Sequence, residues 1–145
     1  MDSYEIAKEW VAALQDSPAL QDFCRDTLGG EPVLILGFDP RAPHGSADAP
    51  YIAVVPFADR DGFERSTARR TVLMALGLNC RERDELANGY EVRGYGLIRR
   101  FESLALDALE GCEAAPSSWE GETSRPGKHL FERHLIFEVV EDNTI

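Results

Sequence analysis

The last third of the chain constrains its fold more than any other part. Residues 97–110 place apolar side chains, among them Ile98 and Phe101, on one stripe at helical spacing. Residues 128–140 form a long apolar-rich run that is typical of a strand. Because earlier runs also predict strands, this last strand is expected to close a sheet that the helix covers. Between the two, residues 113–127 are rich in proline, glycine and serine and predict a loosely structured linker.

Three earlier runs predict the other strands. Residues 33–38 and 51–55 are short, apolar and bounded by turn residues, and residues 67–78 form the third run. Three prolines make the connection 39–50 an irregular loop, and a charged loop over residues 58–66 leads into the third strand.

Two helices are predicted before the first of these strands. Ser17 is the expected N-cap of the second helix, because a proline follows it in the first helical position. Gly29 is expected to end that helix, since glycine accepts the left-handed conformation of a C-cap. Trp10 and Phe23 lie on the apolar stripes of the two helices and are expected in the core.

These elements predict one domain over residues 1–145, long enough to bury about two-thirds of its unfolded surface. The expected fold class is α+β, with a mixed, mostly antiparallel sheet of four or five strands and helices packed on it. Residues 79–89 are polar, and residues 90–95 predict either a short edge strand or the lead into the helix. Trp119, in the linker, either folds back on the core or is exposed for a partner.

The net charge of −11 is unevenly distributed along the chain. Residues 1–31 carry seven acids and two bases, and residues 101–145 carry ten acids and three bases, whereas residues 58–100 carry seven acids and nine arginines. A basic middle between acidic ends suits head-to-tail contacts between identical subunits, although an ordinary solvated surface has the same pattern. An acidic chain without a basic run disfavours direct nucleic-acid binding.

Thirteen arginines accompany only two lysines. Arginine is favoured at interfaces because its planar group pairs with carboxylates through several hydrogen bonds, although a GC-rich genome produces the same bias. We select a candidate interface on the loops 58–66 and 79–88 and on the adjacent arginines. Its residues are Asp59, Arg60, Asp61, Phe63, Glu64, Arg65, Arg69, Arg70, Arg81 and Arg83.

The sequence predicts no catalytic, cofactor or metal site. His44 lies near two aspartates in an irregular loop but lacks a second ligand at the spacing that zinc requires. His129 and His134 are five residues apart on one strand, so they are expected on opposite faces. The glycines around residue 94 lack the lysine of a phosphate-binding loop.

The cysteines indicate a reducing compartment. They are three in number, dispersed along the chain and outside any C-x-x-C pair, which argues against a disulfide framework and against a zinc site. The first residues are acidic, and no apolar run approaches the ~20 residues of a membrane span. The chain is therefore expected to be soluble and cytoplasmic, with no membrane partner.

Three segments and the order of the elements carry a resemblance to a known family. The segments run from Ala49 to Val55, from Gly89 to Gly94 and from Leu130 to Val140. Over most of its length the chain resembles the tail terminator (minor tail protein U-like) and tail-completion proteins of long-tailed phages and prophages. The resemblance implies a small α/β domain that forms a hexameric ring on the head-proximal end of the tail tube, stops tube growth and presents a surface to the head.

The resemblance implies a structural virion protein of the tail or neck, assembled in the host cytoplasm, with no enzymatic activity. Its implied partners are its own copies, the major tail tube protein and the head-tail connector protein, without direct nucleic-acid specificity. Two alternatives stay open. One is a small ligand-binding or enzymatic domain that uses the 39–50 loop, and the other is a different neck or baseplate component of the same particle.

Overall fold

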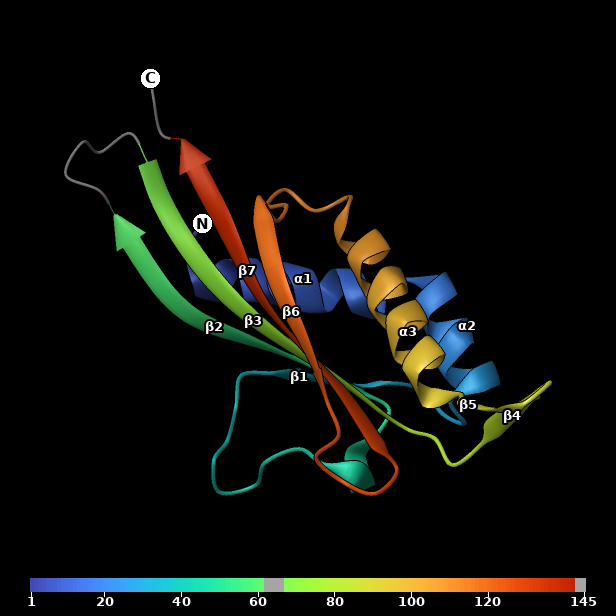
Figure 1. Cartoon of the computed structure of the whole chain (residues 1–145). Helices are drawn as coiled ribbons and strands as arrows, with labels where there is room; N and C mark the ends of the chain where they lie inside the picture. The colour runs from blue at the N-terminus through green and yellow to red at the C-terminus, as the bar shows by residue number, and fades with distance from the viewer. Residues whose placement is uncertain (62–66, 143–145) are drawn as a thin grey trace.

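A computed structural model describes residues 1–61 and 67–142 of the chain. In this part of the chain, three helices pack on one face of a five-stranded sheet (Figure 1). The helices are α1 (Ser3–Gln15), α2 (Pro18–Thr27) and α3 (Gly94–Leu109), with a short 3-10 turn, η1 (Ser46–Asp48). The strands are β1 (Val33–Leu36), β2 (Tyr51–Asp61), β3 (Thr67–Asn79), β4 (Arg83–Leu86), β5 (Gly89–Val92), β6 (Ser118–Ser124) and β7 (Leu130–Asp142).

The main sheet has the strand order β1-β2-β3-β7-β6. β1 is parallel to β2, and the other neighbouring pairs are antiparallel. β4 and β5 form a separate two-stranded sheet. The predicted fold class, a single α+β domain with a mixed and mostly antiparallel sheet, is confirmed, and the main sheet has five strands.

Side-chain hydrogen bonds cap the start of both N-terminal helices, and the expected N-cap of the second helix, Ser17, is confirmed. The Asp2 carboxylate accepts from the backbone N–H of Glu5 at 2.8 Å, and the Glu5 carboxylate accepts from the N–H of Asp2 at 3.3 Å, which is a capping box. The Ser17 hydroxyl accepts from the N–H of Leu20 at 3.3 Å. Gly29 follows the second helix with φ at +87°, a conformation that glycine adopts without strain.

Alternation along β3 divides the main sheet into two faces. Val72, Met74 and Leu76 are buried in one core cluster with residues of the three helices. Leu73 and Ala75 alternate with them and point to the other side of the sheet, which is not covered by α1, α2 or α3. The helix-covered face therefore holds the core, and the opposite face remains available for function.

Aromatic packing on the covered face joins the N-terminal helix α1 to the C-terminal strand β7. The Trp10 ring of α1 meets Phe137 of β7 edge to face, with ring centroids 5.0 Å apart. Its indole N–H donates to the carbonyl of Ala114 at 2.7 Å. Trp10 is fully buried, and Phe23 of α2 is 7% exposed, so the expected core positions of both are confirmed.

The predicted linker over residues 113–127 is wrong, because it contains β6. This strand pairs antiparallel with β7, from Ser118 opposite Glu138 to Ser124 opposite Glu132. Its glycine, serine and glutamate residues have low strand propensity, so pairing with β7 overrides the local preference. Trp119 on β6 packs against the core while it remains 48% exposed.

The predicted charged loop over residues 58–66 is also wrong in its first part, because β2 continues to Asp61. The strand passes Pro56 through an irregularity in register between Pro56 and Ala58. β1 pairs with β2 only as far as Val54, so the outer part of β2 is an edge, where a proline and a bulge are tolerated.

The polar segment at residues 79–89 contains β4, which pairs with β5 as a hairpin. The alternative that residues 90–95 merely lead into the helix is thereby excluded, since β5 ends at Val92 and α3 begins at Gly94. The hairpin stands away from the main sheet beside the first turn of α3 (Figure 1).

Candidate functional site

The face of the main sheet opposite the helices, which we name the open face, is hollowed by a groove of about 820 Å³. Its floor is apolar, because Val55 of β2 lies opposite Leu73 of β3, which in turn lies opposite Ile136 of β7. Phe38 and the 39–50 loop form one wall of the groove, and the turn before β7 forms another. The register of three strands therefore assembles a surface that no single segment carries.

A polar cluster closes one end of this groove. The Tyr51 hydroxyl donates to the carboxylate of Glu132, which is only 8% exposed. His44 of the 39–50 loop lies with Nε2 3.5 Å from Glu132 Oε2, and the imidazole of His134 contacts the other carboxylate oxygen. Burial and the neighbouring Glu132 raise the pKa of Tyr51, so its hydroxyl stays protonated and keeps donating.

The position of Tyr51 depends on a close approach to the neighbouring strand. Gly77 of β3 lies directly opposite Tyr51, and a Cβ on Gly77 would overlap the tyrosine ring. The absence of a side chain at residue 77 thus lets the ring lie close to β3 and reach Glu132.

The predictions for the histidines have mixed outcomes. His134 lies on β7 and joins the cluster with His44, a pairing that the sequence analysis did not foresee. His129 precedes β7, so it is not on the strand as expected. Within the residues that the structure describes, no group of three metal-ligating side chains is arranged to hold an ion. The expected absence of a metal remains a prediction.

The polar cluster ties the 39–50 loop to the sheet. Both oxygens of Glu132 already face a hydroxyl or an imidazole, which anchors the 39–50 loop to the sheet.

Burial raises the pKa of Cys24 to about 12 and also raises the pKa values of Cys80 and Cys112. These thiols are therefore protonated at neutral pH and are poor nucleophiles.

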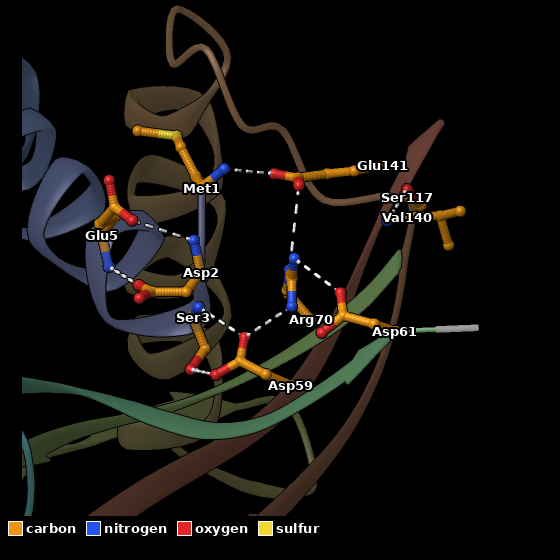
Figure 2. A network of polar contacts seen from close by, with 10 residues as sticks. All are labelled: Met1, Asp2, Ser3, Glu5, Asp59, Asp61, Arg70, Ser117, Val140 and Glu141. Carbon is orange, nitrogen blue, oxygen red and sulfur yellow. Dashed lines mark hydrogen bonds and ion pairs between the residues drawn. The ribbon is translucent and has the colours of Figure 1, made fainter. Parts of the chain in front are cut away.

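A second polar network lies on the helix-covered side, where the N-terminus meets the ends of β2, β3 and β7 (Figure 2). Asp59 accepts from the backbone N–H and from the hydroxyl of Ser3, both at 2.8 Å. Arg70 contacts Asp59 at 3.3 Å, Asp61 at 3.1 Å and Glu141 at 3.8 Å. One guanidinium therefore binds three carboxylates from two strands.

This network changes the acidity of Asp59. Burial acts to raise the pKa of Asp59, but the hydrogen bonds from Ser3 and the charge of Arg70 outweigh it and hold the pKa below its ordinary value. The Arg70 side chain is 12% exposed, whereas that of Asp61 is 74% exposed. Arg70 is thus an internal connection within the subunit, in contrast to the surface role expected for it.

The candidate interface residues separate into several groups. Asp59, Asp61 and Arg70 belong to the network just described, so the expected loop position of the two acids is wrong. Arg60 lies opposite Arg69 on the open face, and both are exposed. The remaining residues lie elsewhere: Arg81 follows β3, Arg83 begins β4, and Phe63, Glu64 and Arg65 lie outside the described residues.

The β4–β5 hairpin projects from the domain and exposes apolar residues. Arg93 holds its base, because its guanidinium binds the Asp84 carboxylate at 2.6 Å and its N–H donates to the carbonyl of Glu82 at 3.2 Å. The Arg83 guanidinium lies 4.3 Å from the centre of the Tyr90 ring. Leu86 remains 57% exposed at the turn.

The sequence analysis missed the open face, although a signal for it exists. Residues 72–78 of β3 are apolar without a break. A strand with one solvated face normally alternates apolar and polar residues, and a continuous apolar run indicates burial on both faces. Tyr51 and Glu132 had no comparable signal, because they are 81 residues apart and only the sheet brings them together.

No family model matches the chain, and no curated protein matches it. Within the described residues, no helix is both long and apolar enough to cross a membrane.

Proposed function

We propose that the protein is a structural component of a phage or prophage tail that caps the tail tube as a ring and forms the head-tail joining surface. The observation that carries this proposal is the β4–β5 hairpin, a projecting arm with Leu86 and Tyr90 exposed. The resemblance in the order of the elements and in three segments supports the same role.

A projecting hairpin suits contacts between subunits for an energetic reason. Two-stranded hairpins are marginally stable in water unless they pack against something else. Leu86 and Tyr90 are 57% and 54% exposed, so the hairpin leaves apolar area that a neighbouring subunit can bury. A contact between an arm and a different surface of the next copy is heterologous, and such contacts form a ring when the rotation from one copy to the next closes.

A ring of this kind has a clear task on a tail. A tail tube grows by repeating one heterologous contact, and such a contact does not stop by itself. A cap that matches the tube on one side only ends the growth and offers its other side to the head. The partners in this proposal are other copies of the chain, most simply six in a ring, the major tail tube protein and the head-tail connector protein. The protein would act in the virion after assembly in the host cytoplasm, without enzymatic activity.

Deleting the gene from its phage or prophage tests this role. We expect tails of irregular and excessive length that do not join heads, as seen by negative-stain electron microscopy, and normal particles after complementation. Tails of normal length that join heads without the protein would contradict the terminator role. Tails of normal length that fail to join heads would point to another neck or baseplate component.

A second candidate function follows from the groove on the open face. Its volume of about 820 Å³ lies within the range of roughly 300–1,000 Å³ that is typical of small-molecule sites, and polar groups lie at one end of an apolar floor. The 39–50 loop, which carries His44, forms part of its wall. Native mass spectrometry of the purified protein would detect a retained ligand at one per chain, and a ligand-free spectrum would oppose this function.

A further inference from the structure

Two kinds of side-chain contact hold the 39–50 loop, a wall of the groove, against the sheet. The Ser46 hydroxyl donates to the Asn79 side chain at 2.7 Å, and the Asn79 amide donates to the carbonyl of Ser46 at 2.8 Å. The His44 imidazole lies with Nε2 3.5 Å from Glu132 Oε2. The first contact joins uncharged groups, whereas the second joins a carboxylate to a group that can take up a proton.

The polar surroundings of His44 come from three elements. β7 supplies Glu132 and His134, whose imidazole contacts the other oxygen of the same carboxylate. β2 supplies the hydroxyl of Tyr51, and η1 supplies Asp48, which adds negative potential at that hydroxyl. In the described part of the chain, the ion-pair partners of Glu132 are these two imidazoles alone. A proton on one of them is therefore the available way to neutralise the carboxylate.

Two opposing effects act on a proton at His44. The side chains of His44 and Glu132 are 13% and 10% exposed, and burial disfavours a charged imidazole. Burial equally disfavours a lone carboxylate, and a proton on His44 converts that lone charge into a neutral pair. Because Glu132 lies on the sheet whether or not the proton arrives, the pairing is the larger effect.

We infer that the contact between His44 and Glu132 is a pH-dependent latch, which holds the 39–50 loop closed in mildly acidic conditions and releases it as the pH rises. Histidine is the side chain that normally changes its charge between about pH 5 and pH 8. The closed loop keeps the imidazole beside a carboxylate and the released loop places it in water, so acid favours the closed loop by linkage. The latch rests on neither proposed function, because it is a property of the isolated subunit.

Trypsin cleavage after Arg41 measures release of the loop in the purified full chain. The Arg41 side chain is 90% exposed, and cleavage follows the population of the released loop when closing is fast. Dividing by the cleavage rate of a synthetic peptide of residues 38–50 removes the pH dependence of trypsin itself. We expect this relative rate to be at least about 5-fold higher at about pH 8 than at about pH 5.5.

Three variants separate the latch from the other contacts. His44→Gln should bring the ratio of the two relative rates close to one, because glutamine does not take up a proton. His134→Gln is the matched control, since His134 contacts the same carboxylate without joining the loop to the sheet, and its ratio should be at least that of the wild type. Asn79→Ala removes the uncharged contact, so it should speed cleavage at both pH values and keep the ratio. Circular dichroism at both pH values confirms that each variant is folded.

Equal relative rates at the two pH values in the wild-type chain would overturn the inference without any variant. A ratio that persists in folded His44→Gln, or one that disappears in His134→Gln, would also overturn it. If His44→Gln does not fold, Glu132→Gln takes its place, because it keeps an acceptor for the Tyr51 hydroxyl and removes the charge. The ratio should then fall close to one, and an unchanged ratio would equally overturn the latch.

Discussion

Arg70 of β3 connects β2 and β7 through a single side chain, and two of its carboxylate partners, Asp59 and Glu141, also bind the N-terminus (Figure 2). The surrounding carboxylates of Asp59, Asp61 and Glu141 would repel one another without it, and the guanidinium itself is largely buried. Its neighbour Arg69 points to the opposite side of the sheet and is exposed. Two adjacent arginines that look alike in the sequence thus have different physical roles.

Arg70→Ala should lower the free energy of unfolding by about 1–2 kcal/mol, because it leaves three carboxylates without their shared partner. We place the effect below that of a fully buried ion pair, since Asp61 is mostly exposed. Arg69→Ala is the matched control and should change stability by no more than about 0.5 kcal/mol. Urea denaturation measures both, and equal effects would contradict the structural role of Arg70.

Asp59 should make the free energy of unfolding depend on pH in the acidic range. Its pKa in the folded protein is lower than the ordinary value near 3.9, so the folded state binds the proton less readily than the unfolded chain. The stability that Asp59 contributes is therefore complete above about pH 4 and is lost as the pH falls through the lower pKa of the folded state. We expect the stability difference between wild type and Asp59→Asn, measured in urea, to be larger at about pH 6 than at about pH 2.5. A difference that is the same at both pH values would contradict this assignment.

Gly77→Ala should destabilise the protein by about 1–3 kcal/mol, because the new methyl group would overlap the Tyr51 ring. The displaced ring would also lose its hydrogen bond to Glu132. Gly111→Ala is a suitable control, since a Cβ at residue 111 meets no atom within 4 Å. Thermal unfolding of the two variants compares them directly, and equal melting temperatures would show that the groove end adapts.

At the scale of elements, the strands of this protein differ in how many neighbouring strands they pair with. β3 is paired along its length with β2 on one side and β7 on the other. The β4–β5 hairpin pairs only within itself in the described part of the chain, and its turn exposes Leu86. The central strand is therefore structural, while the hairpin has the low local stability that contact regions commonly show.

Hydrogen exchange should report this difference. Amides of β3 are expected to exchange by global unfolding, the slowest route, and those of β4 and β5 by local opening at a rate at least about 100-fold faster. Mass spectrometry after pepsin digestion of the unassembled protein measures both segments in one experiment. Equal protection of the hairpin and of β3 would contradict the low local stability of the hairpin in the subunit.

Leu86→Asp should block the proposed role without unfolding the protein. Leu86 is 57% exposed, so its replacement costs little in the subunit, but a charge there would prevent an apolar contact with a neighbour. In a phage that lacks the gene, we expect this variant to fail in complementation, as measured by plaque formation and tail length. Tyr4→Asp, at a similarly exposed residue on α1, is the control and should complement normally. Full complementation by Leu86→Asp would remove the hairpin from the assembly contacts.

At the scale of the whole molecule, the sheet has one face covered by the three helices and one face open. The covered face supplies the core, with Trp10 and Phe101 fully buried beneath the helices. The open face and the β4–β5 hairpin are separate surfaces of the subunit.

Much of the fold was predictable because its signals are local. The capping residue Ser17, the apolar stripe of α3 and the long run of β7 each depend on neighbours within a few turns or along one strand. The candidate site was predicted poorly because its contacts join segments that are distant in the sequence. Arg70 was assigned to a contact surface, and the groove was not foreseen, because both depend on which strands become neighbours.

The sequence by itself determined the α+β class, the two N-terminal helices and the four apolar strands, since periodicity and capping act over short separations. Only the tertiary structure decided that residues 118–124 form β6, because their weak strand propensity matters less than the free edge of β7 beside them. It also decided which side chains meet: Tyr51 with Glu132, and Arg70 with Glu141. Those side-chain contacts follow from strand register, and register is set by the pairing of distant segments around a shared core.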